Sequence, residues 1–125
     1  MRDFAIHLTH KPGEVARVTH ALARGGVNLK SVAGMVIGSQ GLLRLIVDDV
    51  DAARKALQEG NIRFEESELA TVLLENRAGE LENVAGKLAN ANINLQAVYV
   101  VGLDGDLVEL AFAVDDVKKA KKVLE

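Results

Sequence analysis

The feature that most constrains this chain is an internal duplication. Shifting the sequence by 66 positions aligns the segment that begins at Phe4 with the segment that begins at Ala70. After Val98 a one-residue insertion moves the offset to 67, and the alignment continues through the second half of each copy. The matched segments are Gly13-Glu14 with Gly79-Glu80, Val27-Asn28-Leu29 with Ile93-Asn94-Leu95, and Val47-Asp48-Asp49-Val50 with Val114-Asp115-Asp116-Val117. Two copies are too few for a solenoid, so the sequence predicts two related units.

Each copy predicts the same order of strands and helices. In the first copy apolar residues alternate from Phe4 to Leu8, as in a half-buried strand, and then recur at helical spacing, facing inward. These inward helical residues are Val15, Val18 and Leu22, with Leu81, Val84 and Leu88 in the second copy. Gly25-Gly26 ends the first helix, and an Asp at 48 or 49 is expected to cap the next. Strands are expected at 28–37, 42–47 and 62–66.

This order, β-α-β-β-α-β, is that of a ferredoxin-like α+β fold, an antiparallel sheet with both helices on one face. The second copy has its hairpin turn at Asp104-Gly105 and its second helix after Asp115-Asp116. Because the sequence ends at Glu125, that copy is expected to lack its last strand. We therefore predict two ferredoxin-like units in tandem, at residues 1–67 and 68–125.

Composition limits the functions that need consideration. The chain has 125 residues, 49% of them hydrophobic, a formal net charge of -3 and no cysteine. It therefore contains no disulfide scaffold, thiolate zinc site or cysteine nucleophile. A unit of about 60 residues is marginal alone, so we expect the units to pair at sheet edges and the chain to form a homodimer or higher homo-oligomer. The sequence shows no secretory or membrane segment, and a cytoplasmic location is expected.

Other chemical signals are weak. His7, His10 and His20 have no metal-ligand spacing, and the second copy does not repeat them, so no metal is expected. The sequence carries no dinucleotide fingerprint, phosphate loop or catalytic triad, and neither a cofactor nor enzymatic activity is expected. RNA-recognition modules have the same strand order, but they stack bases on aromatic residues. Only 3% of this chain is aromatic, which argues against nucleic acid as a partner.

The most informative segment is the loop between the first strand and the first helix. It reads His10-Lys11-Pro12-Gly13-Glu14 in the first copy and Asn76-Arg77-Ala78-Gly79-Glu80 in the second. Glycine permits a tight turn and a close approach to a ligand, and a helix start offers free N–H groups to a carboxylate. The alternative is that the glycine only makes the turn and the helix start faces solvent. Likewise, Asn28 and Asn94 either contact a ligand or merely favour the turn into the strand.

These motifs resemble the ACT domain. Its signature is an apolar strand, a polar turn with Pro-Gly, a helix with inward Leu/Val residues, and then Ile/Val-Asn-Ile/Leu. The first copy matches with Lys11-Pro12-Gly13-Glu14-Val15 and Val27-Asn28-Leu29, and the second with Arg77-Ala78-Gly79-Glu80-Leu81 and Ile93-Asn94-Leu95. The resemblance covers nearly the whole chain, and it is nearest to small stand-alone proteins with two ACT domains. The second copy departs from the pattern at Ala78, where Pro is usual.

ACT domains are regulatory modules that bind small ligands, most often amino acids, between paired domains. The resemblance implies that this chain senses an amino acid or related small metabolite and modulates a partner, such as a regulated enzyme. The implied ligand-facing residues are His10, Lys11, Pro12, Gly13, Asn28 and Leu29, together with Asn76, Arg77, Gly79, Glu80, Asn94 and Leu95. Asn76 is nearer to the serine-binding version of the motif, and whether both copies bind stays open. The alternative function is a structural interaction module that has kept the fold without the ligand.

Overall fold

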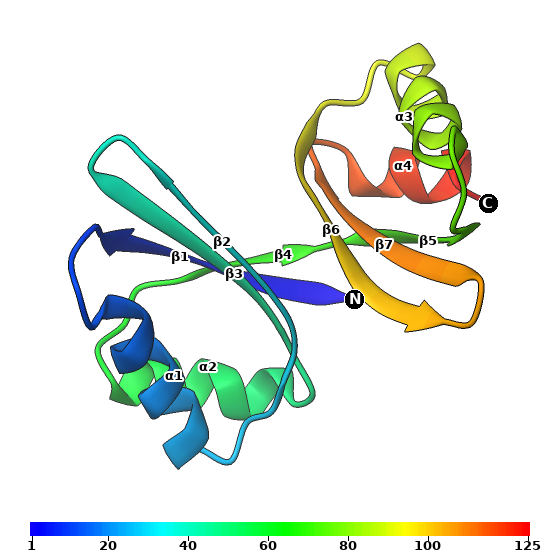
Figure 1. The fold of residues 1–125 in the computed structure, drawn as a ribbon. Helices are drawn as coiled ribbons and strands as arrows, with labels where there is room; N and C mark the ends of the chain where they lie inside the picture. The colour runs from blue at the N-terminus through cyan, green and yellow to red at the C-terminus, as the bar shows by residue number, and fades with distance from the viewer. The chain divides into compact units, whose positions relative to one another are not determined.

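A computed structural model describes all residues from Met1 to Glu125. The chain forms two compact units (Figure 1). The first unit is Arg2–Ser67, and the second is Glu68–Glu125 together with Met1.

The first unit has a four-stranded sheet in the order β2-β3-β1-β4, and α1 and α2 lie on the same side of it (Figure 1). Its pairs β1–β3 and β2–β3 are antiparallel. The elements are β1 (Arg2–Thr9), α1 (Glu14–Arg24), β2 (Leu29–Ile37), β3 (Gln40–Val47), α2 (Val50–Glu59) and β4 (Glu65–Glu68). This is the predicted β-α-β-β-α-β order.

The second unit repeats this arrangement with a three-stranded antiparallel sheet in the order β5-β7-β6. Its elements are β5 (Ala70–Glu75), α3 (Glu80–Asn90), β6 (Leu95–Asp104), β7 (Leu107–Val114) and α4 (Val117–Val123). No strand follows α4, as predicted. The chain thus has two ferredoxin-like units in tandem. No helix has the length and apolarity required to cross a membrane.

Each unit buries its own core between its sheet and its two helices. The alternating residues Phe4, Ile6 and Leu8 of β1 meet Val18 and Leu22 of α1 in the first unit, and all five are buried. The second core contains Ala70, Val84, Leu88, Ile93, Leu110, Phe112 and Ala120. Thirteen buried residues form the first core and seven form the second.

Two local predictions are wrong. Val15 and Leu81 were expected to face inward, but they are 52% and 47% exposed. They lie in the first turn of α1 and α3, and the buried helical stripe begins one turn later, at Val18 and Val84. The last strand was expected at 62–66, but β4 spans Glu65–Glu68. Phe64, just before it, packs against Phe4, with ring centroids 5.3 Å apart.

In each of the repeated Asp-Asp pairs, the two carboxylates accept hydrogen bonds from different elements. Asp49 Oδ1 accepts a hydrogen bond from the Ala52 N–H at 3.0 Å and caps α2, and Asp116 does the same for Lys119 at the start of α4. The preceding residue, Asp48, accepts a hydrogen bond from the Asn28 N–H at 3.0 Å and donates its own N–H to the Asn28 carbonyl at 3.1 Å. The first carboxylate therefore holds the start of an edge strand and the second holds the start of a helix.

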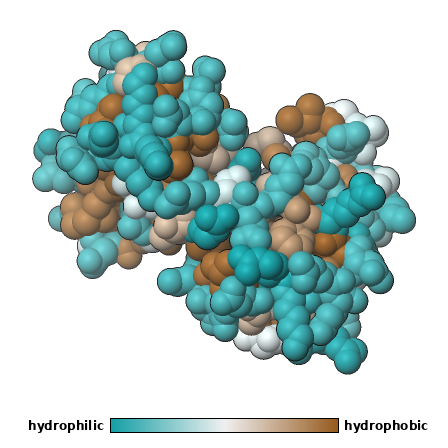
Figure 2. Space-filling view, turned by 180° about the vertical axis from the view of Figure 1, so that it is seen from behind, coloured by the Kyte–Doolittle hydropathy of each residue, from teal (hydrophilic) through white to brown (hydrophobic).

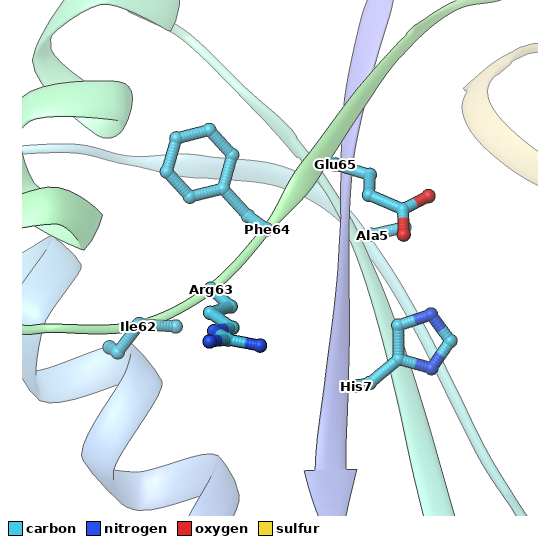
Figure 3. Close-up of a pocket in the computed structure, with 6 residues that line it drawn as sticks. All are labelled: Ala5, His7, Ile62, Arg63, Phe64 and Glu65. Carbon is cyan, nitrogen blue, oxygen red and sulfur yellow. The ribbon is translucent and has the colours of Figure 1, made fainter.

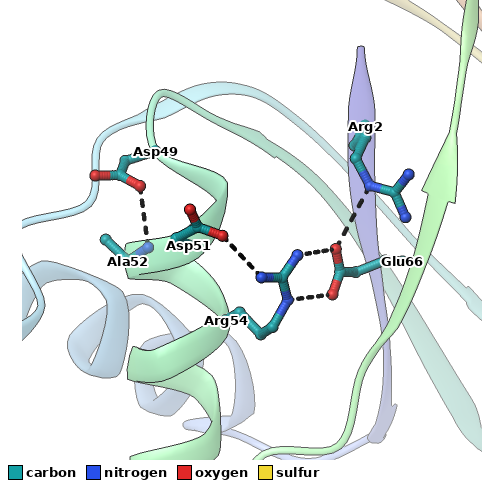
Figure 4. Close-up of polar contacts among 6 residues, drawn as sticks. All are labelled: Arg2, Asp49, Asp51, Ala52, Arg54 and Glu66. Carbon is teal, nitrogen blue, oxygen red and sulfur yellow. Dashed lines mark hydrogen bonds and ion pairs between the residues drawn. The ribbon is translucent and has the colours of Figure 1, made fainter.

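An ion-pair network found only in the first unit joins α2 to β4 and β1 (Figure 4). Arg54 donates two hydrogen bonds to the Glu66 carboxylate, at 2.7 and 2.8 Å, and a third to Asp51 at 2.8 Å. Arg2 Nε lies 3.5 Å from Glu66 Oε1. The hydrogen bonds from Arg54 lower the pKa of Glu66, against the opposing effect of its partial burial.

The inserted residue of the second copy forms a β-bulge. Val32 pairs with Leu45 and Gly34 with Leu43 in the first unit, and the equivalent pairs in the second are Val98 with Phe112 and Val100 with Leu110. The register of β6 then shifts between Val100 and Gly102, which leaves Val101 as the additional residue. Position 34 is therefore equivalent to position 100, and position 41 to position 108.

Candidate functional site

The loops before α1 and α3 have the same backbone structure. His10 N–H donates to the Ser39 carbonyl and Lys11 N–H to the Thr9 carbonyl, at 3.2 and 2.9 Å. The equivalent bonds of Asn76 and Arg77, to Asp106 and Glu75, measure 2.7 and 3.0 Å. Each helix follows a left-handed glycine, Gly13 at φ 92° or Gly79 at φ 89°, and has no side-chain cap. In the second unit the Glu80 N–H donates to the Arg77 carbonyl at 3.4 Å. The first helical turn of α1 has no side-chain cap, so its N–H groups are left for solvent or a ligand.

A cavity of about 260 Å³ adjoins the loop of the first unit. His10 and Lys11 lie on its loop side, and Glu14 and Val15 of α1 also line it. The strands contribute mainly apolar or small residues, namely Leu8, Thr9, Gly34, Met35, Val36, Gly41, Leu42 and Leu43. The cavity therefore combines an apolar interior with charged groups at one side, which is the usual composition of a small-molecule site.

Charged residues of the loops are held by carboxylates in the first helical turn. Lys11 Nζ lies 4.0 Å from Glu14 Oε1, and Arg17 lies 3.5 Å from the other oxygen of the same carboxylate. In the second unit Arg77 makes closer ion pairs, at 2.6 Å to both Glu80 and Glu75. The hydrogen bond to Glu80, with the charge of Glu75, raises the pKa of Arg77. Lys11 is thus the less tightly paired of the two loop cations.

The structure brings together only some of the predicted site residues. Within each unit the loop residues are adjacent, at the sheet end where Thr9 pairs with Gln40 and Gln40 with Ile37. Asn28 and Leu29 lie at the opposite end, where Leu29 pairs with Val47. β2 has nine residues, so these two groups are separated by roughly 25 Å. Asn94 and Leu95 are placed in the same way, at the end of β6 remote from the loop with Asn76, Arg77, Gly79 and Glu80.

The sequence reasoning missed the residues that fix these asparagines. Asp115 accepts from the Asn94 N–H at 3.1 Å, and the Asn94 carbonyl accepts from the Asp115 N–H at 3.3 Å, as Asp48 and Asn28 do in the first unit. The main chain of each asparagine is therefore bound within its unit, while both residues are exposed. The repeated Asp-Asp sequence was the available signal, but helix capping explained only its second member.

A second cavity of the first unit, of about 540 Å³, lies between β1 and the segment that leads into β4 (Figure 3). Its polar lining residues are His7, Arg63 and Glu65, all exposed. Figure 3 shows Phe64 directed away from these groups, toward the helices. None of the predicted site residues lines this cavity, and its wall depends on β4, which has no equivalent in the second unit.

Apolar side chains remain exposed along both edge strands, and Figure 2 shows apolar patches on the surface of each unit. β2 and β6 are edge strands because each pairs on only one side. The exposed apolar residues on them are Val32, Met35, Val36 and Ile37 in the first unit, and Leu95, Val98, Val100 and Leu103 in the second. A strand at the edge of a sheet with exposed apolar side chains is suited to pairing with another strand.

Comparison with known proteins supports the fold through structure alone. No model of a protein family matches the sequence, and no curated protein does. Among solved structures, protein BT0572 from Bacteroides thetaiotaomicron has a TM-score of 0.87 and 25% identity, over 98% of this chain and 85% of that one. The regulatory subunit of aspartate kinase from Thermus thermophilus has a TM-score of 0.65 and 17% identity, over 98% and 88% of the two chains.

A third similar structure is E. coli aspartokinase III in complex with lysine and aspartate. It has a TM-score of 0.56 and 22% identity, and the match covers 98% of this chain but 29% of that chain. The shared part is therefore a portion of a larger enzyme in one case and nearly a whole regulatory subunit in the other. Together with the element order, the antiparallel registers and the duplicated loop, these similarities show that the chain has the tandem ACT-domain fold.

Proposed function

We propose that this protein is a regulatory protein that binds an amino acid or a related small metabolite and conveys its presence to a partner protein. The observation that carries the proposal is the cavity beside the His10–Gly13 loop, in a fold shared with a regulatory subunit of aspartate kinase. The ionic groups of an amino acid match the polar loop side of this cavity, where Lys11 lies next to the open start of α1. We propose no catalytic activity for it. The cytoplasmic location expected from the sequence belongs to the same proposal.

The arrangement of the predicted residues supports a site formed between paired units. The loop and the asparagine lie at opposite ends of an edge strand, so one unit cannot bring both to the same ligand. If the edge strands of two copies of the chain pair antiparallel, the loop end of one strand lies beside the asparagine end of the other. We therefore propose that the chain forms a homodimer or higher homo-oligomer. A ligand that contacts both units would stabilise the paired arrangement, and this change in population is the signal to the partner.

Isothermal titration of the full chain with each of the twenty common amino acids tests this proposal. At least one is expected to bind in the micromolar to low-millimolar range, and Asn94→Ala is expected to weaken that binding. Asn90→Ala is the matched control, because Asn90 is also exposed but lies at the end of α3. No heat from any amino acid, with an unchanged circular dichroism spectrum, would contradict ligand binding. A monomeric mass by light scattering would contradict the oligomer.

The exposed apolar residues of β2 and β6 favour one alternative, an interaction module without a ligand. In that case the edge strands bind a partner directly by strand addition. The two functions differ in one measurement. Capture of the partner by the immobilised protein should change on addition of the ligand found by titration if the protein is a sensor, and should be insensitive to every amino acid if it is only an interaction module.

A further inference from the structure

The two units differ at the strand positions beneath the loop. In the first unit these positions are Gly34 on β2 and Gly41 on β3, both of which line the cavity. A Cβ built on Gly34 would lie 3.4 Å from Leu43 Cδ1, and one on Gly41 would lie 3.6 Å from Leu8 Cβ. Since Leu8 and Leu43 belong to the buried core, both glycines face the helix-covered side of the sheet. The absence of two side chains therefore leaves space under the start of α1.

The equivalent positions of the second unit are occupied by valine. Val100 pairs with Leu110 as Gly34 pairs with Leu43, and Val108 pairs with Leu74 as Gly41 pairs with Leu8. Leu110 lies in the second core and both Val108 and Leu74 pack against it, so this pair of positions also faces the helices. The second unit thus carries two isopropyl groups where the first unit has no side chain. Val108 packs against the second core, and Val100 is 49% exposed.

From this difference we infer that the chain holds one ligand, at the His10–Gly13 loop of the first unit, and that the Asn76–Gly79 loop binds none. This inference rests on the proposed function and specifies which of its two loops acts. The two loops share two backbone hydrogen bonds and a left-handed glycine, so the distinction rests on the strand residues beneath them. Asn94 can still contribute to the site, because it precedes β6, which lies at the edge of its sheet.

The lining of the cavity also indicates the class of ligand. Around Gly34 and Gly41 the wall is formed by aliphatic groups, including Leu8, Val36 and Leu43, and no charged residue lines it from the strands. The charged lining residues, Lys11 and Glu14, come from the loop and the first turn of α1. A volume of about 260 Å³ lies below the usual range for drug-sized ligands. We therefore assign to the cavity a small amino acid with an uncharged aliphatic side chain, whose ionic groups lie on the loop side.

Titration of the full chain with L-valine, L-leucine and L-isoleucine tests this inference, with L-lysine and L-aspartate as charged probes. An aliphatic amino acid is expected to bind with one ligand per chain. Gly34→Val introduces the side chain of the second unit and is expected to weaken binding by roughly 100-fold or more, since filling an apolar pocket excludes its ligand. Gly34→Ala, which adds only a Cβ at 3.4 Å from Leu43, is expected to have an intermediate effect.

Gly102→Val is the matched control. Gly102 lies on the edge strand of the second unit, has no positive φ, and a Cβ there would meet Glu109 at 3.8 Å. The affinity of the Gly102→Val variant for the ligand should lie within about twofold of that of the original chain. Two ligands per chain, or undiminished binding by a folded Gly34→Val variant, would overturn the single site while leaving the proposed function intact. Binding of lysine or aspartate alone would overturn the ligand class, and no binding of any amino acid would overturn both proposals.

Discussion

The two units keep the same loop and differ in what surrounds it. Both loops make the same two backbone hydrogen bonds and precede a helix without a side-chain cap. In both units an aspartate also binds the asparagine that precedes the edge strand. The first unit adds a fourth strand, a larger core and two glycines under the helix, where the second has a three-stranded sheet and two valines. After a duplication, the backbone structure of the loop has been retained, while the strand side chains that line the cavity have diverged.

The largest expected effect concerns the two cores. Phe4 and Phe112 are both fully buried, and replacing either with alanine should destabilise its unit by about 3–5 kcal/mol. Hydrogen exchange of peptides from the full chain should show lost protection in the mutated unit first. The loss should be more complete for Phe112→Ala, because its core has seven buried residues against thirteen. Equal deprotection of both units by either variant would show that they do not unfold separately.

The next effect tests whether the two loops are truly equivalent. Gly13→Ala and Gly79→Ala each place a Cβ in the left-handed region, which should cost about 1–2 kcal/mol in the free energy of unfolding. No atom lies within 4 Å of either new Cβ, so the cost is confined to the backbone and should be the same at both sites. Urea unfolding measures it. Gly86→Ala, in the middle of α3 with equally open surroundings, should instead stabilise the chain by about 0.5–1 kcal/mol.

A smaller effect compares the capped helices. Removing the cap by Asp49→Ala or Asp116→Ala should cost about 1 kcal/mol. Because α4 has seven residues and α2 has ten, the loss of helical protection should extend further along α4. Hydrogen exchange over residues 117–123 and 50–59 provides the comparison. Protection lost equally along both helices would contradict the role assigned to helix length.

The smallest effect is the acid sensitivity of the network around Glu66. Its pKa is lowered in the folded chain, so this carboxylate stabilises the first unit above the ordinary pKa of glutamate. That contribution is lost as the pH falls through the lowered folded value. The melting temperature of the original chain should therefore exceed that of Glu66→Gln at pH 7, and the difference should vanish in acid. A constant difference across this pH range would assign the effect to packing instead of charge.

Much of the fold could be predicted because the same pattern of residues occurs in both copies of the duplicated sequence. Alternation in Phe4, Ile6 and Leu8, helical spacing in Val18 and Leu22, and the glycines after the first helix each indicate one element. The errors lie where the periodic pattern ends and neighbouring elements decide the outcome. Val15 continues the helical stripe in sequence, yet it lies over the cavity beside Gly34 and stays half exposed.

The candidate site was less predictable. The loop residues follow from the motif, but the separation of Asn28 from His10 depends on the direction of β2, which only strand pairing establishes. The sequence alone shows glycine in the first copy where the second copy has valine. The meaning of this difference required two facts from the structure, that Gly34 and Gly41 face the helices and that the insertion falls at Val101, after the first of these positions and before the second.

The bulge at Val101 has a consequence for how such proteins change over evolutionary time. An insertion within a central strand would reverse every following side chain between core and solvent. In the edge strand β6 the additional residue is left unpaired as a bulge, and pairing resumes with Gly102 opposite Glu109. The second core is thus unaffected by the difference in length between the copies. Edge strands of duplicated units are positions where insertions are tolerated, so one copy can acquire a new interface while the other keeps its older role.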